Sequence, residues 1–107
     1  MNETKQRKAV ELLSSLDDAL KSSPCAGTVD DAQEAIGDAI KVLTDDTASY
    51  KASDYAVARA HSKISRLVGF KSLKLSDQAQ EAWHNFKDFV YGDAHDDLRS
   101  VGGMNLG

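Results

Sequence analysis

The sequence predicts an all-α protein: an antiparallel up-down four-helix bundle over residues 1–92, followed by a short, partly flexible C-terminal tail over residues 93–107. Three observations support this prediction. Apolar residues recur at helical spacing in four separate segments. The chain is rich in alanine and contains a single proline, Pro24, which favours helix. The connections between the segments are short, so sequential helices are expected to be antiparallel neighbours.

The first helix is predicted from about Thr4 to Ser22. Its apolar face consists of Val10, Leu13, Leu16 and Leu20, widened by Ala9, Leu12 and Ala19. Pro24 ends the helix, because the residue before a proline is pushed out of the α region. Gly27 is expected to complete the turn.

The second helix is predicted to begin after Thr28 as its N-cap, with Asp30 and Asp31 at the positive end of the helix dipole. Gly37 lies inside this helix, and a close crossing with another helix would explain it. The predicted buried stripe consists of Val29, Ala32, Ile36, Ile40 and Leu43. Residues 44–50 form a polar connection.

The third helix is expected to start near Ser53, with Ser53 or Ala52 at the cap, and to stop at Gly69. Its inner face contains Val57, Ala60, Ile64, Leu67 and Val68. Ser76 is the predicted N-cap of the fourth helix, which ends at Gly92. The core positions of this helix are Ala79, Ala82, Trp83, Phe86, Phe89 and Val90. In the tail, one short helical turn is expected to dock Leu98 and Val101 on the bundle.

Several features favour a cytoplasmic protein. No segment approaches the ~20 consecutive apolar residues that a membrane span needs. The N-terminal segment is charged and lacks the apolar region of a secretory signal. Cys25 is the only cysteine, so no internal disulfide can form, and the Ser-Pro-Cys-Ala-Gly loop around it contains no His or Lys that would activate the thiol.

Positive charge concentrates in residues 51–74, which hold six basic side chains and only one acidic side chain, Asp54, although the whole chain carries a net charge of −4. Arg59, Lys63 and Arg66 stand at i, i+4 and i+7, which predicts one basic stripe opposite the apolar face of the third helix. Lys71 and Lys74 extend the stripe. It is either a docking surface for anionic inner-leaflet lipid or an acidic protein loop, or a solvated face that complements the acidic second helix. Nucleic-acid binding is not expected, because the chain is acidic and no aromatic residue interleaves the stripe.

No catalytic, metal or cofactor site is expected. The chain has no phosphate-binding glycine loop, no nucleophile elbow and no HExxH motif. It also lacks four closely spaced Cys or His ligands for zinc. His95 is flanked by Asp93, Asp96 and Asp97, which form either a weak cation site or, the favoured interpretation, a solvated acidic tail. His84 is expected at the surface, because its neighbour Trp83 belongs to the core.

The segment around His61 resembles the phosphoacceptor helix of histidine phosphotransfer domains, whose motif is His-x-x-Lys-Gly. Here Lys63 stands at the second position after the histidine, and Ser65 replaces the glycine. That resemblance implies an exposed His61 as phosphoacceptor. The competing interpretation is a histidine at the border of the core.

A wider resemblance covers residues 5–91. The length, the four helix positions, the junction near Ser49-Tyr50 and the run Leu73-Lys74-Leu75-Ser76-Asp77-Gln78 are similar to those of the immunity proteins for pediocin-like (class IIa) bacteriocins. In that family a Leu-x-Phe-Thr-x-Glu-Gln-like sequence opens the fourth helix.

The resemblance to immunity proteins implies a non-catalytic, cytoplasmic bundle that acts at the inner face of the membrane. Such proteins bind the mannose phosphotransferase permease once bacteriocin has engaged it and block the lethal pore. The family's C-terminal half determines specificity, which points to Lys71, Lys74, the fourth helix and the tail residues Asp93, His95, Asp96, Asp97 and Arg99. Arg59, Lys63 and Arg66 would face anionic headgroups. A non-catalytic helical adaptor is the remaining interpretation.

Overall fold

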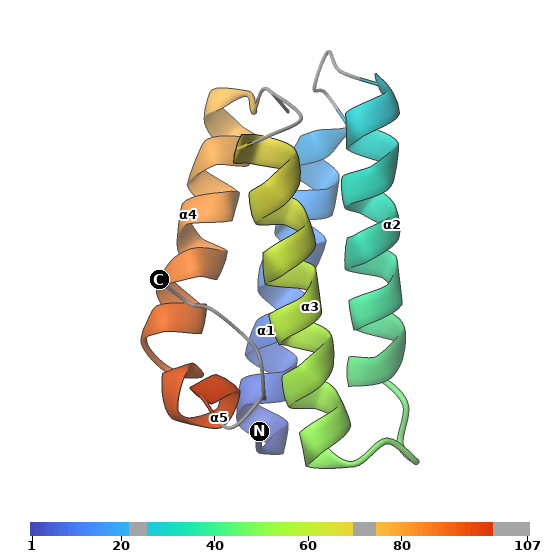
Figure 1. Cartoon of the computed structure of the whole chain (residues 1–107), viewed down its shortest axis with the longest axis vertical. Coiled ribbons are helices and arrows are strands. Elements are labelled where there is room, and N and C mark those ends of the chain that lie inside the picture. The colour runs from blue at the N-terminus through green and yellow to red at the C-terminus, as the bar shows by residue number, and fades with distance from the viewer. Residues whose placement is uncertain (22–25, 70–74, 100–107) are drawn as a thin grey trace.

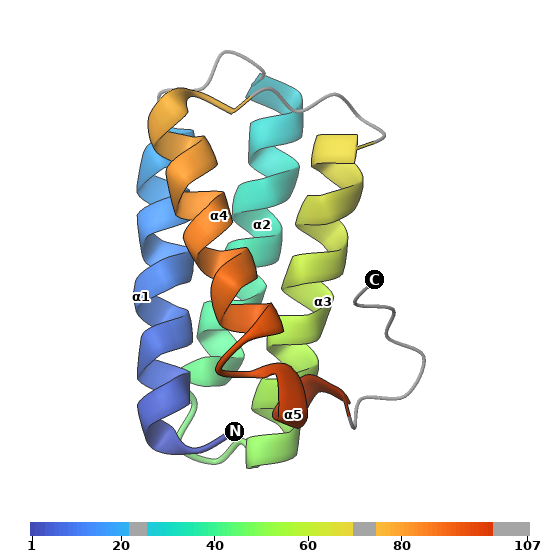
Figure 2. The same cartoon turned by 90° about the vertical axis from the view of Figure 1, so that its left-hand side faces the viewer.

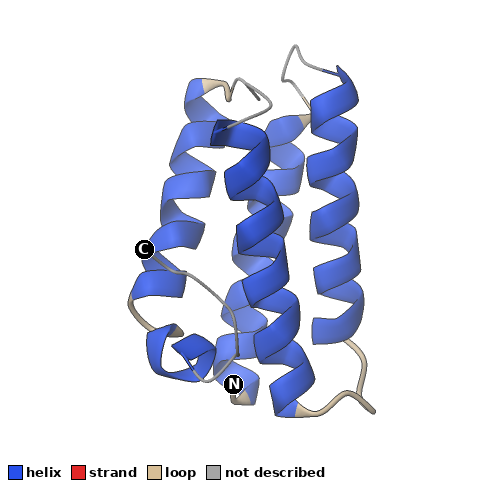
Figure 3. Cartoon of the chain, in the orientation of Figure 1, coloured by secondary structure: helices blue, strands red, loops and turns tan. Residues whose placement is uncertain are grey.

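The computed structural model is all-helical over the residues that it describes, which are 1–21, 26–69 and 75–99 (Figure 3). No strand occurs within these ranges, which confirms the all-α prediction for them. The helices are α1 (Glu3–Leu20), α2 (Ala26–Leu43), α3 (Tyr50–Gly69), α4 (Asp77–Tyr91) and the short α5 (His95–Arg99). Cys25, Lys71, Lys74 and Val101 lie outside the described residues.

Four long helices lie side by side, and α5 packs at one end of them (Figures 1 and 2). The start of α1, the end of α2, the start of α3 and α5 share this end of the molecule. The ammonium group of Met1 links two of them, because it pairs with the Asp54 carboxylate at 2.5 Å and donates to the Tyr50 carbonyl oxygen at 3.1 Å. Helix α2 packs against both α1 and α3, while α1 also packs against α4.

The second and third helices begin earlier than predicted. Helix α2 starts at Ala26, so Thr28 is not its N-cap, Gly27 is helical, and Asp30 and Asp31 fall beyond the first turn. Alanine is the strongest helix former, which favours a helix that already includes Ala26. The predicted cap at residue 28 was therefore wrong.

Helix α3 begins at Tyr50 rather than near residue 53. The Ser49 hydroxyl accepts a hydrogen bond from the Ala52 N–H at 3.0 Å, as an N-cap side chain does. Ser53, one of the predicted caps, is instead fully buried inside the helix, where its hydroxyl accepts a hydrogen bond from Gln6 Nε2 at 2.7 Å. Ser49, at the end of the polar connection, therefore occupies the capping position that the sequence predicts for Ser53 or Ala52.

Helix α4 follows the prediction closely. The Ser76 hydroxyl accepts from the Ala79 N–H at 3.2 Å, and Gly92 caps the other end through its N–H to the Asp88 carbonyl oxygen at 2.9 Å. A Cβ at residue 92 would lie only 2.8 Å from that oxygen, so the cap requires glycine. All the predicted core positions of α4 are buried: Ala79, Ala82, Trp83, Phe86, Phe89 and Val90.

The predicted apolar faces of the other helices also form the core, with Val10, Leu12, Ile40 and Val68 partly buried at its edge. The core continues past α4, because Ala94 and Leu98 are fully buried. Leu98 therefore docks as predicted. Gly37 does not mark a close helix crossing: it is exposed, and a Cβ there would have no neighbour within 4 Å.

Candidate functional site

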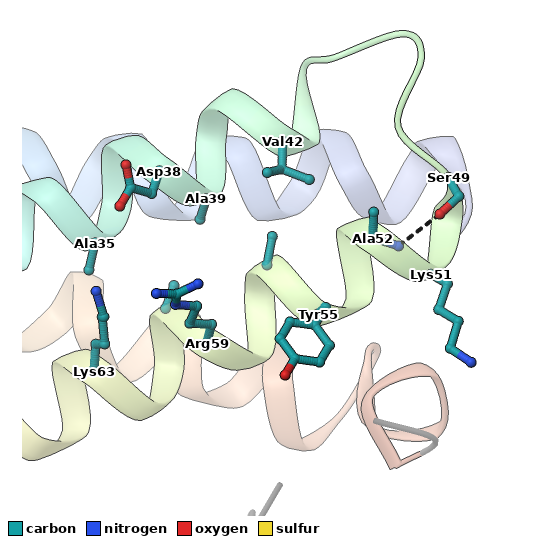
Figure 4. Close-up of a pocket in the computed structure, with 12 residues that line it drawn as sticks. Ala35, Asp38, Ala39, Val42, Ser49, Lys51, Ala52, Tyr55, Arg59 and Lys63 are labelled. Atoms are coloured by element: carbon teal, nitrogen blue, oxygen red, sulfur yellow. Dashed lines mark hydrogen bonds between the residues drawn. The ribbon is translucent and has the colours of Figure 1, made fainter. Parts of the chain in front are cut away.

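A groove lies between α2 and α3, with a cavity volume of about 530 Å³. Its floor is made mostly of alanines, and charged side chains stand along its walls (Figure 4). Helix α2 and the connection after it contribute Ala35, Asp38, Ala39, Val42 and Ser49, and α3 contributes Lys51, Ala52, Tyr55, Ala56, Arg59, Ala60 and Lys63. We call this hollow the α2–α3 groove.

The spacing of the alanines produces the groove. Ala35 and Ala39 are four residues apart on α2, and Ala52, Ala56 and Ala60 are four apart on α3. Residues at this spacing share one helix face, so each helix presents a line of single methyl groups to the other. Short side chains leave unfilled space above the seam where the two helices meet.

Three basic side chains flank the groove, and all of them come from α3. Within the described residues, Lys51, Arg59 and Lys63 form no salt bridge. The only acidic side chain among the lining residues is Asp38, from the α2 wall. The groove is thus a local positive site on a chain whose net charge is −4.

The predicted basic stripe divides between two environments. Arg59 and Lys63 line the α2–α3 groove, and Lys63 is half-buried there, so the stripe does not lie wholly opposite the packed face of α3. Arg59 and Lys63 reach the groove because the small alanine side chains let α2 approach this edge of α3. Arg66 is exposed and does not line the groove.

The predicted tail residues form a separate group around α5. Asp93 and Asp96 are exposed, and His95 is half-buried with its Nδ1 3.8 Å from Asp96 Oδ1. Asp97 is tied to α1 through a 2.8 Å salt bridge with Lys5 Nζ, and this hydrogen bond raises the pKa of Lys5. Arg99 is the last residue of α5. Figures 1 and 2 place α5 beside α4 and the start of α3, away from α2, so the structure does not join these residues to the groove.

His61 is buried, with 4% of its surface exposed. Its ring stacks on Trp83 at a centroid distance of 5.7 Å and meets the edge of Tyr91 at 5.4 Å. Neither ring nitrogen has a hydrogen-bond partner within the described residues. Burial lowers the pKa of His61, and the charge of Lys87 lowers it further. The exposed imidazole that a phosphoacceptor needs is not present at this position.

No group of three or more His, Cys, Asp or Glu side chains in the described ranges could hold a metal ion. His84 is exposed, as predicted, with its Nε2 3.3 Å from Asp88 Oδ2. None of the described helices has the length and apolar character needed to cross a membrane.

Sequence reasoning missed the floor of the groove and two residues on its walls, Lys51 and Tyr55. The signal was present in the four-residue spacing of the alanines on two successive helices. Alanines at this spacing indicate ordinary core positions in the sequence. Only the packing of α2 on α3 shows that these alanines line a groove.

Comparisons with protein-family models, with curated proteins and with solved structures find no match to this chain.

Proposed function

We propose that this chain is a bacteriocin immunity protein, a non-catalytic binding protein that protects its host against a class IIa bacteriocin. It acts from the cytoplasm at the inner face of the membrane, where it binds the bacteriocin-engaged mannose phosphotransferase permease and blocks the pore. Its fold is an antiparallel up-down four-helix bundle. The meeting of the start of α1, the end of α2 and the start of α3 at one end of the molecule supports this topology.

The observation that carries the proposal is the α2–α3 groove with its unpaired basic wall. Arg59 and Lys63 form no salt bridge within the described residues and stand beside an apolar floor. An apolar hollow flanked by charge suits binding to another molecule. The exposed carboxylates Asp93 and Asp96 beside α5 offer a second contact, on the part of the chain that the family resemblance links to specificity.

The proposal is tested by expressing the chain in the cytoplasm of a sensitive strain and challenging it with a panel of class IIa bacteriocins. We expect protection against one or a few peptides. The double substitution Asp93→Lys/Asp96→Lys should reduce or redirect that protection, because both side chains are exposed and the buried Leu98 is left in place. Deleting residues 93–107 would be a weaker test, since it removes Ala94 and Leu98 from the core.

His61→Gln separates immunity from phosphotransfer. Immunity requires no chemistry at His61, so the variant should protect as well as the wild type at equal abundance, whereas a phosphoacceptor cannot be replaced by glutamine. If the folded wild-type protein gives no protection across the panel, the immunity proposal fails and a non-catalytic helical adaptor remains.

A further inference from the structure

We propose that the α2–α3 groove binds an acidic amphipathic helix of a partner protein. The inference rests on the proposed partner-binding function and names the class of segment that the groove accepts. In this mode of recognition an amphipathic helix lays its apolar face into a groove, with anchors at i, i+3, i+4 and i+7. The alanine floor leaves room for the large apolar side chains of such a helix.

The distribution of charge favours a helix over a single-headed lipid or fatty acid. Lys51, Arg59 and Lys63 are separated by eight and four residues along α3, which corresponds to about 12 Å and about 6 Å along the helix axis. A fatty acid presents one carboxylate at one end of its chain. A helix with an acidic residue on each turn or two can meet all three cations in sequence.

The dimensions of the groove agree with this occupant. Along α3 its lining extends from Lys51 to Lys63, a length of about 18 Å, which is about three turns of a partner helix. Tyr55 lines the same groove with 59% of its surface exposed. Tyrosine and arginine are enriched among the residues that dominate binding energy at protein interfaces, so Tyr55 and Arg59 are the expected anchors.

The two walls also predict the orientation of the partner. Every lining cation comes from α3, whereas the lining acid, Asp38, comes from α2. The partner helix should therefore carry its acidic residues along the flank that faces α3. The flank that faces Asp38 should be uncharged or basic, because a carboxylate placed there would be repelled.

The experiment uses a fluorescently labelled synthetic helix of about 18 residues, long enough to form helix in isolation. Leucines occupy the i, i+3, i+4 and i+7 positions of one face, and glutamates line one flank. Binding to the full chain is measured by fluorescence anisotropy. A second peptide, with lysines in place of the glutamates, controls for apolar association.

We expect the acidic peptide to bind and the lysine peptide to bind at least about tenfold more weakly, since like charges meet at the α3 wall. The double variant Arg59→Glu/Lys63→Glu should weaken binding of the acidic peptide about tenfold or more. Arg66→Glu is the matched control, because Arg66 is an exposed cation of the same helix that lies outside the groove. Its effect should stay below about twofold.

Ala56→Leu tests the floor separately from the charge. The larger side chain should fill part of the groove and weaken binding about tenfold, while the circular dichroism spectrum stays helical. Equal weakening by Arg66→Glu and by Arg59→Glu/Lys63→Glu would overturn the proposal in favour of non-specific attraction to the basic stripe.

Other results would also overturn it. The first two are no binding at peptide concentrations of about 1 mM and equal binding of the two peptides. The third is displacement of the peptide from the groove by anionic phosphatidylglycerol vesicles. The fourth is a dimer of this chain that dissociates in the Arg59→Glu/Lys63→Glu variant. The vesicle and dimer results would assign the groove to a lipid surface or to a second copy. Peptide binding without bacteriocin protection would contradict the immunity proposal alone. Bacteriocin protection that persists in the Arg59→Glu/Lys63→Glu variant would contradict only the proposal that the α2–α3 groove binds the partner helix.

Discussion

The surroundings of the His61 imidazole disfavour its charged form, because the ring is buried against Trp83 and Tyr91 with Lys87 nearby. Its pKa in the folded chain lies below the ordinary value of 6.5. Below about pH 6.5 the unfolded chain therefore binds a proton at this residue that the folded chain resists. The free energy of unfolding should fall as the pH drops through this region, by no more than about 1.4 kcal/mol per pH unit from this one group.

His61→Phe should remove this pH dependence. Near pH 7.5 the variant is expected to be about 1 kcal/mol more stable, because it lacks the two buried nitrogens that have no hydrogen-bond partner in the described part of the chain, and its ring still packs on Trp83. Its advantage should grow at about pH 5.5. Urea unfolding of both proteins at the two pH values measures the effect. Parallel pH profiles would show that His61 titrates alike in the folded and unfolded chains.

Trp83 and His84 are neighbours in sequence with opposite roles, which makes them a matched pair. Trp83 is buried, contacts His61 and Phe86, and has Lys87 Nζ 5.6 Å from its ring centroid, so Trp83→Ala should cost about 3–5 kcal/mol of unfolding free energy. His84→Ala should stay within about 0.5 kcal/mol, because that side chain is exposed. Chemical denaturation gives both values, and a loss below about 1 kcal/mol for Trp83→Ala would contradict the burial of the ring.

At the scale of the element, the start of α4 depends on one hydroxyl. Ser76→Ala removes the acceptor for the Ala79 N–H and should cost about 1 kcal/mol. Ser76→Asp keeps an acceptor there and adds negative charge at the helix N-terminus, so it should retain most of the stability. Thermal unfolding compares the variants. Equal losses for alanine and aspartate would rule out capping as the role of this side chain.

The short helix α5 is tied to the rest of the molecule by Leu98 in the core and by the salt bridge between Lys5 and Asp97. Leu98→Ala should cost about 2–3 kcal/mol, toward the low end for a buried leucine because α5 can move to close the cavity. Lys5→Met should leave the core intact and only increase hydrogen exchange at the Leu98 amide. A change below about 0.5 kcal/mol for Leu98→Ala would mean that α5 contributes little to the folded core.

At the scale of the whole molecule, the groove cations should matter little for stability. Arg59→Glu/Lys63→Glu moves the formal net charge from −4 to −8, since each substitution removes two positive units. Neither side chain forms a salt bridge within the described residues, so the free energy of unfolding should change by less than about 1 kcal/mol. Thermal unfolding checks this value, and a larger loss would show that the two cations hold α2 and α3 together.

Local patterns in the sequence predicted much of the fold. Helix α4 is the clearest case, because its cap at Ser76, its apolar face and its end at Gly92 are all encoded within the segment itself. The start of α2 was harder to place, since Thr28 carries the capping signal although the helix already includes Ala26 and Gly27. Glycine disfavours helix by about 1 kcal/mol relative to alanine, so local preference does not predict a helical Gly27.

The groove could not be predicted in the same way, because it depends on which helices meet. Periodicity shows that Ala39 and Ala56 lie at apolar positions, but not that they face each other across a seam. The burial of His61 depends likewise on rings from another helix, Trp83 and Tyr91 on α4. Residue spacing within one helix contains no information about the neighbour that completes such a site.

The stacked pair of His61 and Trp83 gives the molecule a built-in optical reporter. Trp83 is the only tryptophan in the chain, and it lies where α3 meets α4, whereas the groove lies where α3 meets α2. Its emission therefore monitors one seam of the protein while a ligand occupies another. A partner that binds without disturbing the fold will leave the emission of Trp83 unchanged. A partner that binds by separating the helices will expose Trp83 to water and shift its emission maximum toward the red.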